Sequence, residues 1–470
     1  MNNKIGSLLK NFSYSIVSNF LTLAITTIII LIAPKIIGVT EYGYWQLYLF
    51  FSSYVGIFYF GWLDGIYLRY GGYEYDELDR PLFFSQFVEI VVMHLVIASL
   101  ICLYAVTISD PNRQFIFFMI AFDLIAFNLS QFFIFILQST NRIKEFSFVN
   151  TSGRIFYFVI VVALIIFKVP GFELYVVADI LGRLFALVYG LYLCKDLVFV
   201  GFDKFKFYFE EVKENIQVGF KLLVANFAGI LVIGVVRYGI QSNWSVGIFG
   251  KISLTLSLSN FLMTFITSIG IVLYPMLRRV APSKLNEIYY ALLKTVDVIL
   301  LLMLFAYFPI YLILPKWLPQ YADSLKYMAI LFPMIVYNGK FSLLTVTFMK
   351  TFRFEKSLLY VNVISVIFSL LFTGVFAYWL HNLNIMMLSV TIVLFLQNTI
   401  GEYVLSKRIG VHISKQILLE SMVIIAFIAS NWYLNILWGL LIFTVAYILY
   451  LLVNKNQIKS GISELKVLMK

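Results

Sequence analysis

Charged side chains inside long apolar stretches of the sequence are the residues with the greatest capacity for chemistry. Such a side chain costs about 2.5–3.5 kcal/mol at the centre of a membrane-spanning helix, so it requires a partner of opposite charge or an aqueous cavity. Two pairs can neutralise themselves on one helix face, Asp179 with Arg183 at spacing i,i+4 and Lys294 with Asp297 at i,i+3. Other cations have no neighbour of opposite sign on their own predicted helix: Arg154, Lys221, Arg237, Lys251 and Lys340.

Cations of this kind indicate an anionic solute. Isolated arginines suit phosphate best, because a guanidinium can hold two phosphate oxygens at once. Lys221 and Lys251 lie close to predicted helix ends, where a long side chain can instead reach the membrane surface, and Lys221 lies about 160° around its helix from Arg237. We therefore favour Arg154 and Arg237 as anion-binding residues, with Lys221, Lys251 and Arg69 as further candidates.

Acidic residues supply candidates for gating or ion coupling. Residues 61–72 combine several glycines with Asp64 and Arg69 at the predicted end of the second apolar stretch. A carboxylate beside an arginine could form a gate there, or could simply end a helix. Glu89 and Asp123 lie in the third and fourth stretches, where each could pair with a base from another helix or carry a coupling proton or sodium ion.

Motifs for catalysis are absent from the sequence. It has no phosphate loop ending in Gly-Lys-Ser/Thr, no His-Glu-x-x-His and no nucleophile elbow. The three histidines, His94, His381 and His412, are too scattered to share a site, and two cysteines give neither a disulfide framework nor a metal-ligand spacing. We expect a carrier rather than an enzyme, with no metal, no cofactor and no nucleic-acid partner.

The composition places these residues in a membrane protein. Hydrophobic residues form 61% of the 470 residues and charged residues 13%, which excludes a soluble globular enzyme. Apolar stretches of about 20 residues, the length of a membrane-spanning helix, number about 14. They cover residues 12–33, 44–65, 83–108, 115–138, 146–167, 172–194, 217–240, 246–273, 289–314, 324–349, 357–380, 384–405, 417–433 and 435–453. We expect an all-α integral membrane protein with about 14 transmembrane helices.

Lysine and arginine gather in every second connection between these stretches. The other connections hold only Lys35, Arg113, Lys168 and Lys316, and basic connections lie on the cytoplasmic side of a membrane. Both termini are therefore predicted to be cytoplasmic. The longest basic connection, residues 195–215, alternates phenylalanine with charged residues, as a helix on the membrane surface or a plain linker would.

The same connection divides the chain into two pseudo-symmetric lobes of six helices each. We expect an N-lobe at 1–215, which includes the amphipathic linker, and a C-lobe at 216–405. Residues 406–470 would form spans thirteen and fourteen and a basic cytoplasmic tail. Two related short segments favour this repeat, because residues 41–45 and 245–250 occupy equivalent places in the two halves. Six spans per repeat give both halves the same orientation.

The order and spacing of several motifs resemble the polysaccharide flippases, which translocate O-antigen and capsule repeat units. These proteins form a family of the multidrug/oligosaccharidyl-lipid/polysaccharide exporter superfamily. The resemblance covers the whole chain in span count, orientation and motif order. The motifs are Lys10-Asn11-Phe12, residues 36–45, Gly61 to Arg69, residues 246–250, and residues 273–277.

The resemblance implies two lobes around a central cationic cavity lined by spans one, two, seven and eight. It places Arg69, Lys221, Arg237 and Lys251 on the lining helices, and Arg154 comes from the first lobe. It implies that an undecaprenyl-diphosphate-linked oligosaccharide passes by alternating access from the inner to the outer leaflet of the bacterial cytoplasmic membrane. Membrane lipids, a polysaccharide polymerase and chain-length machinery are the further partners. Spans thirteen and fourteen are similar to those of larger members, where they can form a groove for the lipid tail.

Three other functions stay open. A drug or metabolite antiporter of the same superfamily would rely on unpaired acids such as Glu89 and Asp123, whereas cations predominate here. A membrane polysaccharide polymerase or ligase would carry a large outer loop, and the predicted outer loops are short. A peptidoglycan-precursor flippase would differ only in its substrate.

Overall fold

The structure, a computed structural model, describes residues 21–22, 24–277, 280, 282–410 and 414–468. Within these ranges 11 helices are long and apolar enough to cross a membrane, or up to 13 if each of two bent helix pairs is one span. These helices coincide with the predicted apolar stretches from the second onward. The first stretch is described only from residue 21, and it contains a shorter apolar helix, Ala24–Ile37. The all-α membrane fold is confirmed, while Lys10-Asn11-Phe12 and His412 lie outside the described residues.

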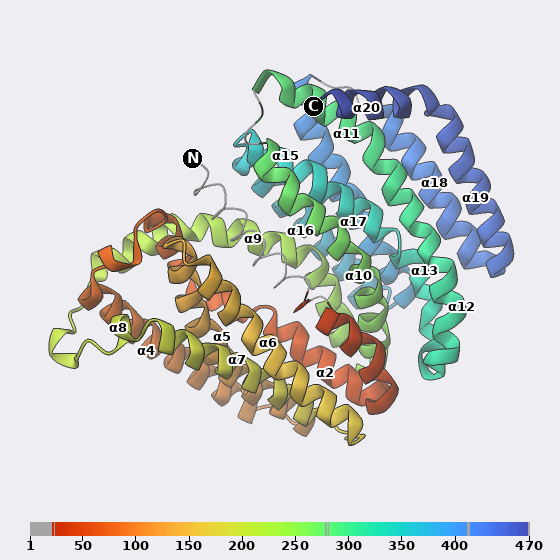
Figure 1. Cartoon of the computed structure of the whole chain (residues 1–470). Helices are drawn as coiled ribbons and strands as arrows, with labels where there is room; N and C mark the ends of the chain where they lie inside the picture. The colour runs from red at the N-terminus through yellow and green to blue at the C-terminus, as the bar shows by residue number, and fades with distance from the viewer. Residues whose placement is uncertain (1–20, 23, 278–279, 281, 411–413, 469–470) are drawn as a thin grey trace. The chain divides into compact units, whose positions relative to one another are not determined.

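The chain divides into two compact units, Met1–Phe227 and Ala228–Lys470. Long helices, joined by short turns, form the first unit, and its last helix continues into the second (Figure 1). After the helix at Ala24–Ile37, its elements are α2 (Val39–Ser52), η1 (Val55–Tyr59), α3 (Trp62–Arg69), η2 (Tyr75–Glu77), α4 (Arg80–Val106), α5 (Pro111–Ser139), α6 (Ile143–Ile166), α7 (Glu173–Leu193), α8 (Lys195–Val198), η3 (Phe202–Lys204) and α9 (Phe209–Asn243).

The second unit contains more interrupted helices than the first. Two of its segments, η6 and η7, are π-helical. Its elements are α10 (Val246–Leu277), α11 (Pro282–Met303), η4 (Leu304–Ala306), α12 (Tyr307–Trp317), η5 (Pro319–Tyr327), α13 (Met328–Leu331), α14 (Met334–Lys340), η6 (Phe341–Val346), α15 (Thr347–Thr351), α16 (Glu355–Thr373), η7 (Gly374–Trp379), α17 (Leu383–Ile409), α18 (Ser414–Tyr433), α19 (Ile436–Val453) and α20 (Lys455–Leu468).

Local sequence explains where the long helices begin. Asp110 accepts hydrogen bonds from the backbone N–H groups of Asn112 and Arg113, at 2.9 and 3.4 Å, and Pro111 occupies the first turn of α5. Asp79 caps α4 in the same way. A capping carboxylate satisfies N–H groups that have no partner within the helix, and proline needs none. The capping carboxylates and the prolines therefore fix where α4 and α5 begin.

The second predicted span is broken where α2 and η1 meet α3. Phe60 and Gly61 both have positive φ angles, of 51° and 84°, and the two helical parts are bent by 59°. Glycine populates this left-handed region without steric cost. The glycine after Phe60 thus sets a bend inside an apolar span.

Glycines also bring α3 into backbone contact with α9. A Cβ atom on Gly65 would overlap the backbone carbonyl of Asn215, and one on Gly219 would overlap the carbonyl of Gly61. Small residues permit this approach between membrane helices. The glycine-rich segment 61–72 therefore has a packing role in addition to its predicted place at a helix end.

The connection at 195–215 is a linker rather than a surface helix. It contains α8, η3 and irregular chain, and α9 begins only at Phe209. Gly201 has a φ of 104°, which interrupts any continuous helix. Phe199, Phe202 and Phe207 are each at least 77% exposed, so the alternation with lysines reflects an exposed loop.

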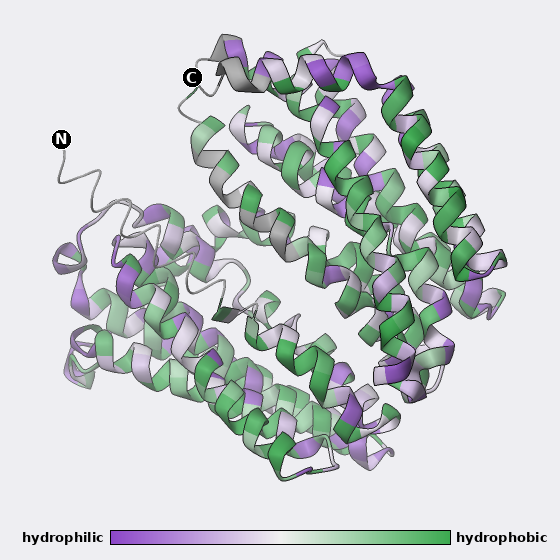
Figure 2. Cartoon of the chain, turned by 45° about the vertical axis from the view of Figure 1, so that its right-hand side comes forward, coloured by the Kyte–Doolittle hydropathy of each residue, from purple (hydrophilic) through white to green (hydrophobic). Residues whose placement is uncertain are grey.

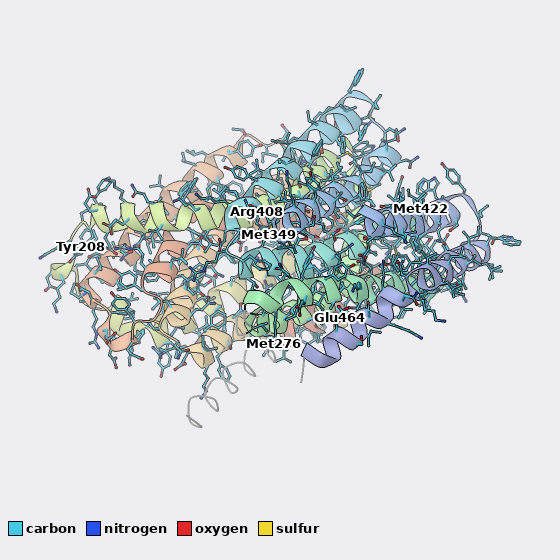
Figure 3. The ribbon with its side chains drawn as sticks, turned by 90° about the horizontal axis from the view of Figure 1, so that it is seen from above. Tyr208, Met276, Met349, Arg408, Met422 and Glu464 are labelled. Carbon is cyan, nitrogen blue, oxygen red and sulfur yellow. The ribbon has the colours of Figure 1, made fainter. Side chains whose placement is uncertain are left out.

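Helix α20 differs from the spans before it. Hydrophobic residues cover most of the long helices, whereas hydrophilic residues are frequent on α20 (Figure 2). It turns away from α19 and packs against α11 (Figure 1). Glu464, labelled in Figure 3, lies on α20 with Oε1 3.3 Å from Nζ of Lys294. The predicted Lys294–Asp297 pair is therefore wrong, because Lys294 pairs with α20 and Asp297 with Lys340, 3.1 Å away.

Gly65→Ala tests the contact between α3 and α9. The added methyl group has no room beside Asn215, so we expect the free energy of unfolding in detergent to fall by about 1–3 kcal/mol, as for other overpacked sites. Gly374→Ala is the matched control, because nothing lies within 4 Å of its added Cβ. Equal stability of both variants would contradict the contact.

Candidate functional site

Arg183 is the centre of a charged cluster in the first unit. We call Asp123, Arg154, Asp179 and Arg183 the Arg183 cluster. The Arg183 Nε donates to Oδ2 of Asp179 at 2.9 Å, and its Nη1 lies 2.9 Å from Oδ1 of Asp123. These residues come from α5, α6 and α7, and both carboxylates are buried. The predicted Asp179–Arg183 pair is confirmed, and Asp123 finds its base on another helix.

Polar side chains of α2 complete the contacts of this cluster. The Arg183 Nη2 donates to Oγ of Ser52 at 2.7 Å, and the Tyr48 hydroxyl donates to Oδ2 of Asp179 at 3.0 Å. A buried charge is tolerated when it is paired and hydrogen-bonded. Two arginines and two aspartates balance formally, so the cluster can be neutral as a whole.

Arg154 occupies the open side of the Arg183 cluster. Its side chain is 44% exposed, compared with 15% for Arg183, and its Nη1 reaches Asp179 only at 3.5 Å. A pocket of ≈ 50 Å³ lies beside it, lined by polar Ser130, Gln131 and Asn150 and by three residues of the cluster, Arg154, Asp179 and Arg183. One water needs about 10–15 Å³ of such volume, so this pocket can hold a few waters or a small polar group. Within the described ranges Arg154 makes one long ion pair, to Asp179, so most of its five N–H donors face no carboxylate there.

Arg69 lies in a separate cluster with residues of α9. Its guanidinium contacts Oε1 of Glu211, Oε2 of Glu214 and Oδ1 of Asn215, each at 2.7 Å. Burial raises the pKa of Tyr70, which keeps its hydroxyl protonated, and this hydroxyl donates to Glu211 at 2.7 Å. The structure therefore joins Arg69 to acids of α9 rather than to Asp64.

The two other acids predicted for gating or ion coupling have different surroundings. Asp64 is buried in the first turn of α3, and the hydroxyl of Tyr59 hydrogen-bonds to it. Glu89 is partly buried in α4 and accepts a hydrogen bond from the backbone N–H of Tyr208 at 3.3 Å. Tyr208 precedes the first residue of α9 and is labelled in Figure 3.

The remaining predicted cations each have their own local surroundings. Lys221 is exposed on α9. Arg237 donates to Oγ of Ser253 at 3.2 Å and lies over the ring of Phe249. Phe249 and Ser253 are each two residues from Lys251 along α10, which is about 200° of helix rotation, so Lys251 points to nearly the opposite side of the helix. Its Nζ lies 3.7 Å from Oδ2 of Asp323. Arg237 and Lys251 thus use different faces of α10, and the cavity expected to join all five cations stays a prediction.

Sequence reasoning named Lys340 and Asp297 but missed the deeply buried charged cluster in which they meet. Lys340 of α14 contacts Asp297 of α11, Glu402 of α17 and Glu420 of α18. We call these four residues the Lys340 cluster. All four lie within predicted spans, and for Lys340, Glu402 and Glu420, which have no base or acid one turn away, that pattern indicates a partner on another helix. It does not say which helices meet.

The fold has counterparts among solved structures. An inward-facing multidrug resistance MATE family transporter of the MOP superfamily superimposes with a TM-score of 0.60 and 13% identity, over 83% of this chain and 98% of that one. The lipid II flippase MurJ, in an inward closed conformation, gives a TM-score of 0.57 and 12% identity, over 96% of this chain and all of that one. No protein-family model matches the sequence, and no curated protein does.

The long apolar helices and the fold together define a multi-pass membrane protein. Its fold is the one found in transporters of the MOP superfamily. The sequence resemblance predicted this superfamily fold. The structural counterparts are a transporter and a flippase rather than enzymes.

Substitutions of Arg183 and Arg154 should distinguish an arginine that stabilises the fold from one that is available for binding. Arg183→Ala leaves Asp123 and Asp179 without their closest base, so we expect a loss of about 3–5 kcal/mol in the free energy of unfolding in detergent. Arg154→Ala removes a half-exposed group with one long contact and should change stability by less than about 1 kcal/mol. A large loss in Arg154→Ala would show that this residue is structural.

Proposed function

We propose that the protein is a flippase for undecaprenyl-diphosphate-linked oligosaccharide repeat units. It would move them from the inner to the outer leaflet of the bacterial cytoplasmic membrane by alternating access, for surface polysaccharide biosynthesis. Two observations support the proposal: a fold like that of a lipid II flippase, and the motif order of the sequence. A polysaccharide polymerase and chain-length machinery would receive the exported unit.

The availability of Arg154 carries the proposal. Its side chain is 44% exposed beside a pocket partly lined by Ser130, Gln131 and Asn150, and its carboxylate neighbour, Asp179, is already held by Arg183 at 2.9 Å. A diphosphate could therefore bind Arg154 without leaving Asp179 unpaired. Guanidinium binds phosphate oxygens in a planar, bidentate geometry. Arg237, Lys221, Lys251 and Arg69 are assigned to the same anion path, with Asp64, Glu89 and Asp123 in gating or ion coupling.

The membrane potential is sufficient to drive such an export. Moving a group of about two negative charges outward, across a potential of about 100 mV that is negative inside, releases roughly 4.6 kcal/mol at about 2.3 kcal/mol per charge. The sequence contains no ATP-binding loop that would supply energy instead.

Removal of the proposed diphosphate ligands should stop transport without preventing insertion. We expect Arg154→Ala and Arg237→Ala to lower export about tenfold or more, because a hydrogen bond to a charged group is worth about 1.5–3 kcal/mol. Arg154→Lys should recover only part of the rate, since an ammonium lacks the bidentate geometry. The measurement is mass spectrometry of polyprenyl-linked glycans in each leaflet of cells that depend on the variant.

Arg80→Ala is the matched control, because Arg80 is a surface arginine of the same unit with a 54% exposed side chain. It should export normally. Accumulation of one complete lipid-linked oligosaccharide in the inner leaflet of depleted cells would identify the substrate. Normal export by Arg154→Ala would remove the main support for the proposal.

Flipping should also respond to an imposed potential. In proteoliposomes, a potential of about 100 mV that is negative on the entry side should favour the exit leaflet by roughly 4.6 kcal/mol at equilibrium for a doubly charged diphosphate. A fluorescent diphosphate lipid, read by quenching from outside, reports the distribution. A distribution indifferent to the potential would require another driving force.

The second candidate is an ion-coupled multidrug or metabolite antiporter. Its support is the fold shared with a multidrug resistance transporter and the presence of fully buried carboxylates such as Asp123. It predicts an unchanged pool of lipid-linked glycans in depleted cells, together with altered sensitivity to cationic drugs.

A further inference from the structure

The Lys340 cluster surrounds one ammonium with three carboxylates. The Lys340 Nζ lies 2.6 Å from Oε2 of Glu420, 2.9 Å from Oε1 of Glu402 and 3.1 Å from Oδ1 of Asp297. All four side chains are at most 2% exposed. They come from four different helices, α11, α14, α17 and α18, so the cluster lies where these helices meet.

Charge balance distinguishes this cluster from the Arg183 cluster. Three ionised carboxylates and one ammonium would leave a formal charge of −2 in a site without water access. A buried carboxylate that is not compensated takes up a proton rather than remain charged. Two protons make the four residues electrically neutral.

The hydrogen-bond donors indicate which acids hold these protons. Asp297 accepts from Lys340, Gln416 and Tyr450, three donors that favour an anion. Glu402 accepts from Lys340 and Asn398, and Glu420 from Lys340. Among the described residues, one oxygen of each acid has no hydrogen-bond partner, but Oδ1 of Asp297 still lies 3.1 Å from Nζ of Lys340, whereas Oε2 of Glu402 and Oε1 of Glu420 have no such ion-pair contact. A neutral acid at these two places costs far less to bury than a carboxylate does.

Tyrosines surround the cluster, and one of them has a hydroxyl free to assist proton transfer. Tyr289 of α11 is fully buried within electrostatic range of Glu402, Lys340 and Asp297, and its hydroxyl has no hydrogen-bond partner in the described ranges. Tyr337 of α14 faces Glu420, and Tyr450 of α19 bonds to Asp297. The nearby base Lys294 is occupied by Glu464 of α20.

The local backbone suits a site that changes state. Lys340 ends α14 and is followed directly by the π-helical segment η6. Single π-helical turns interrupt the regular ladder of helix hydrogen bonds and occur frequently at functional sites. The ammonium of Lys340 occupies the centre where a metal cation would bind, and no cluster of potential metal ligands is found among the described residues.

We propose that the Lys340 cluster is a proton-binding site in which Glu402 and Glu420 carry exchangeable protons and Asp297 remains the anionic partner of Lys340. Loss of the protons leaves uncompensated negative charge between α11, α14, α17 and α18. That charge draws water in and favours separation of the four helices. Proton exchange would thus be tied to the conformation of the second unit, whatever solute the protein moves.

Infrared spectroscopy of the purified full-length protein in lipid nanodiscs tests the site directly. The carbonyl absorption of a protonated carboxyl differs from that of a carboxylate, so Glu402→Gln and Glu420→Gln should each lose one protonated carboxyl at pH 7. Glu355→Gln is the control, because Glu355 is an exposed acid at the start of α16. It should keep the whole absorption of protonated carboxyls.

Unfolding as a function of pH gives a second readout. The two glutamates are ionised in the unfolded chain above about pH 4.3 but protonated in the folded protein. Stability should therefore be greatest at low pH and fall as pH rises, with the unfolding constant increasing tenfold per pH unit for each proton held. Each glutamine variant should remove one such tenfold factor, and Glu355→Gln should remove none.

Several outcomes would overturn the proposal. Unchanged carboxyl absorption and an unchanged pH slope in both glutamine variants would mean that these acids are ionised in the folded protein. Failure of a glutamine variant to fold would mean the same, because glutamine reproduces the neutral acid in size and polarity. Loss of the protonated absorption when sodium chloride replaces choline chloride would assign the cluster to sodium instead.

Discussion

The need to compensate charge inside apolar helices governs how both units of this protein are assembled. Arg183 joins α2, α5 and α7 because its guanidinium has donors for Asp123, Asp179 and Ser52 at once. Apolar packing alone holds membrane helices weakly, since lipid chains are as apolar as leucine. Buried ion pairs contribute what packing cannot: they specify which helices are neighbours, because a wrong neighbour would leave a charge without a partner.

The two buried clusters solve this problem differently. The Arg183 cluster has equal numbers of acids and bases, and one of its bases, Arg154, faces a pocket. The Lys340 cluster has an excess of acids and is closed on all sides. In the proposed function, the first would exchange partners with an anion that enters the pocket. The second can change its charge only when its helices let protons pass.

The sequence predicted the positions of the helices well, because an apolar stretch of about 20 residues usually forms a membrane-spanning helix. Pairing within one helix was also predictable, as for Asp179 and Arg183, because helix geometry fixes which residues share a face. Contacts between different helices were not predictable, because hydropathy does not indicate which helices lie side by side. Hence the pairing of Lys340 with its three acids was missed, and Lys294 was assigned a partner on its own helix although its ion pair is with Glu464 on α20.

The break at Gly61 has an electrostatic consequence for Asp64. Because α3 begins at Trp62, within an apolar span, the positive end of its macrodipole lies inside the membrane-spanning segment. Aligned peptide dipoles concentrate about half a positive charge at a helix N-terminus, and a carboxylate in the first turn is stabilised by it. Asp64 occupies that turn. The bend therefore supplies from the backbone a positive partner for this buried acid, which no arginine or lysine side chain has to provide.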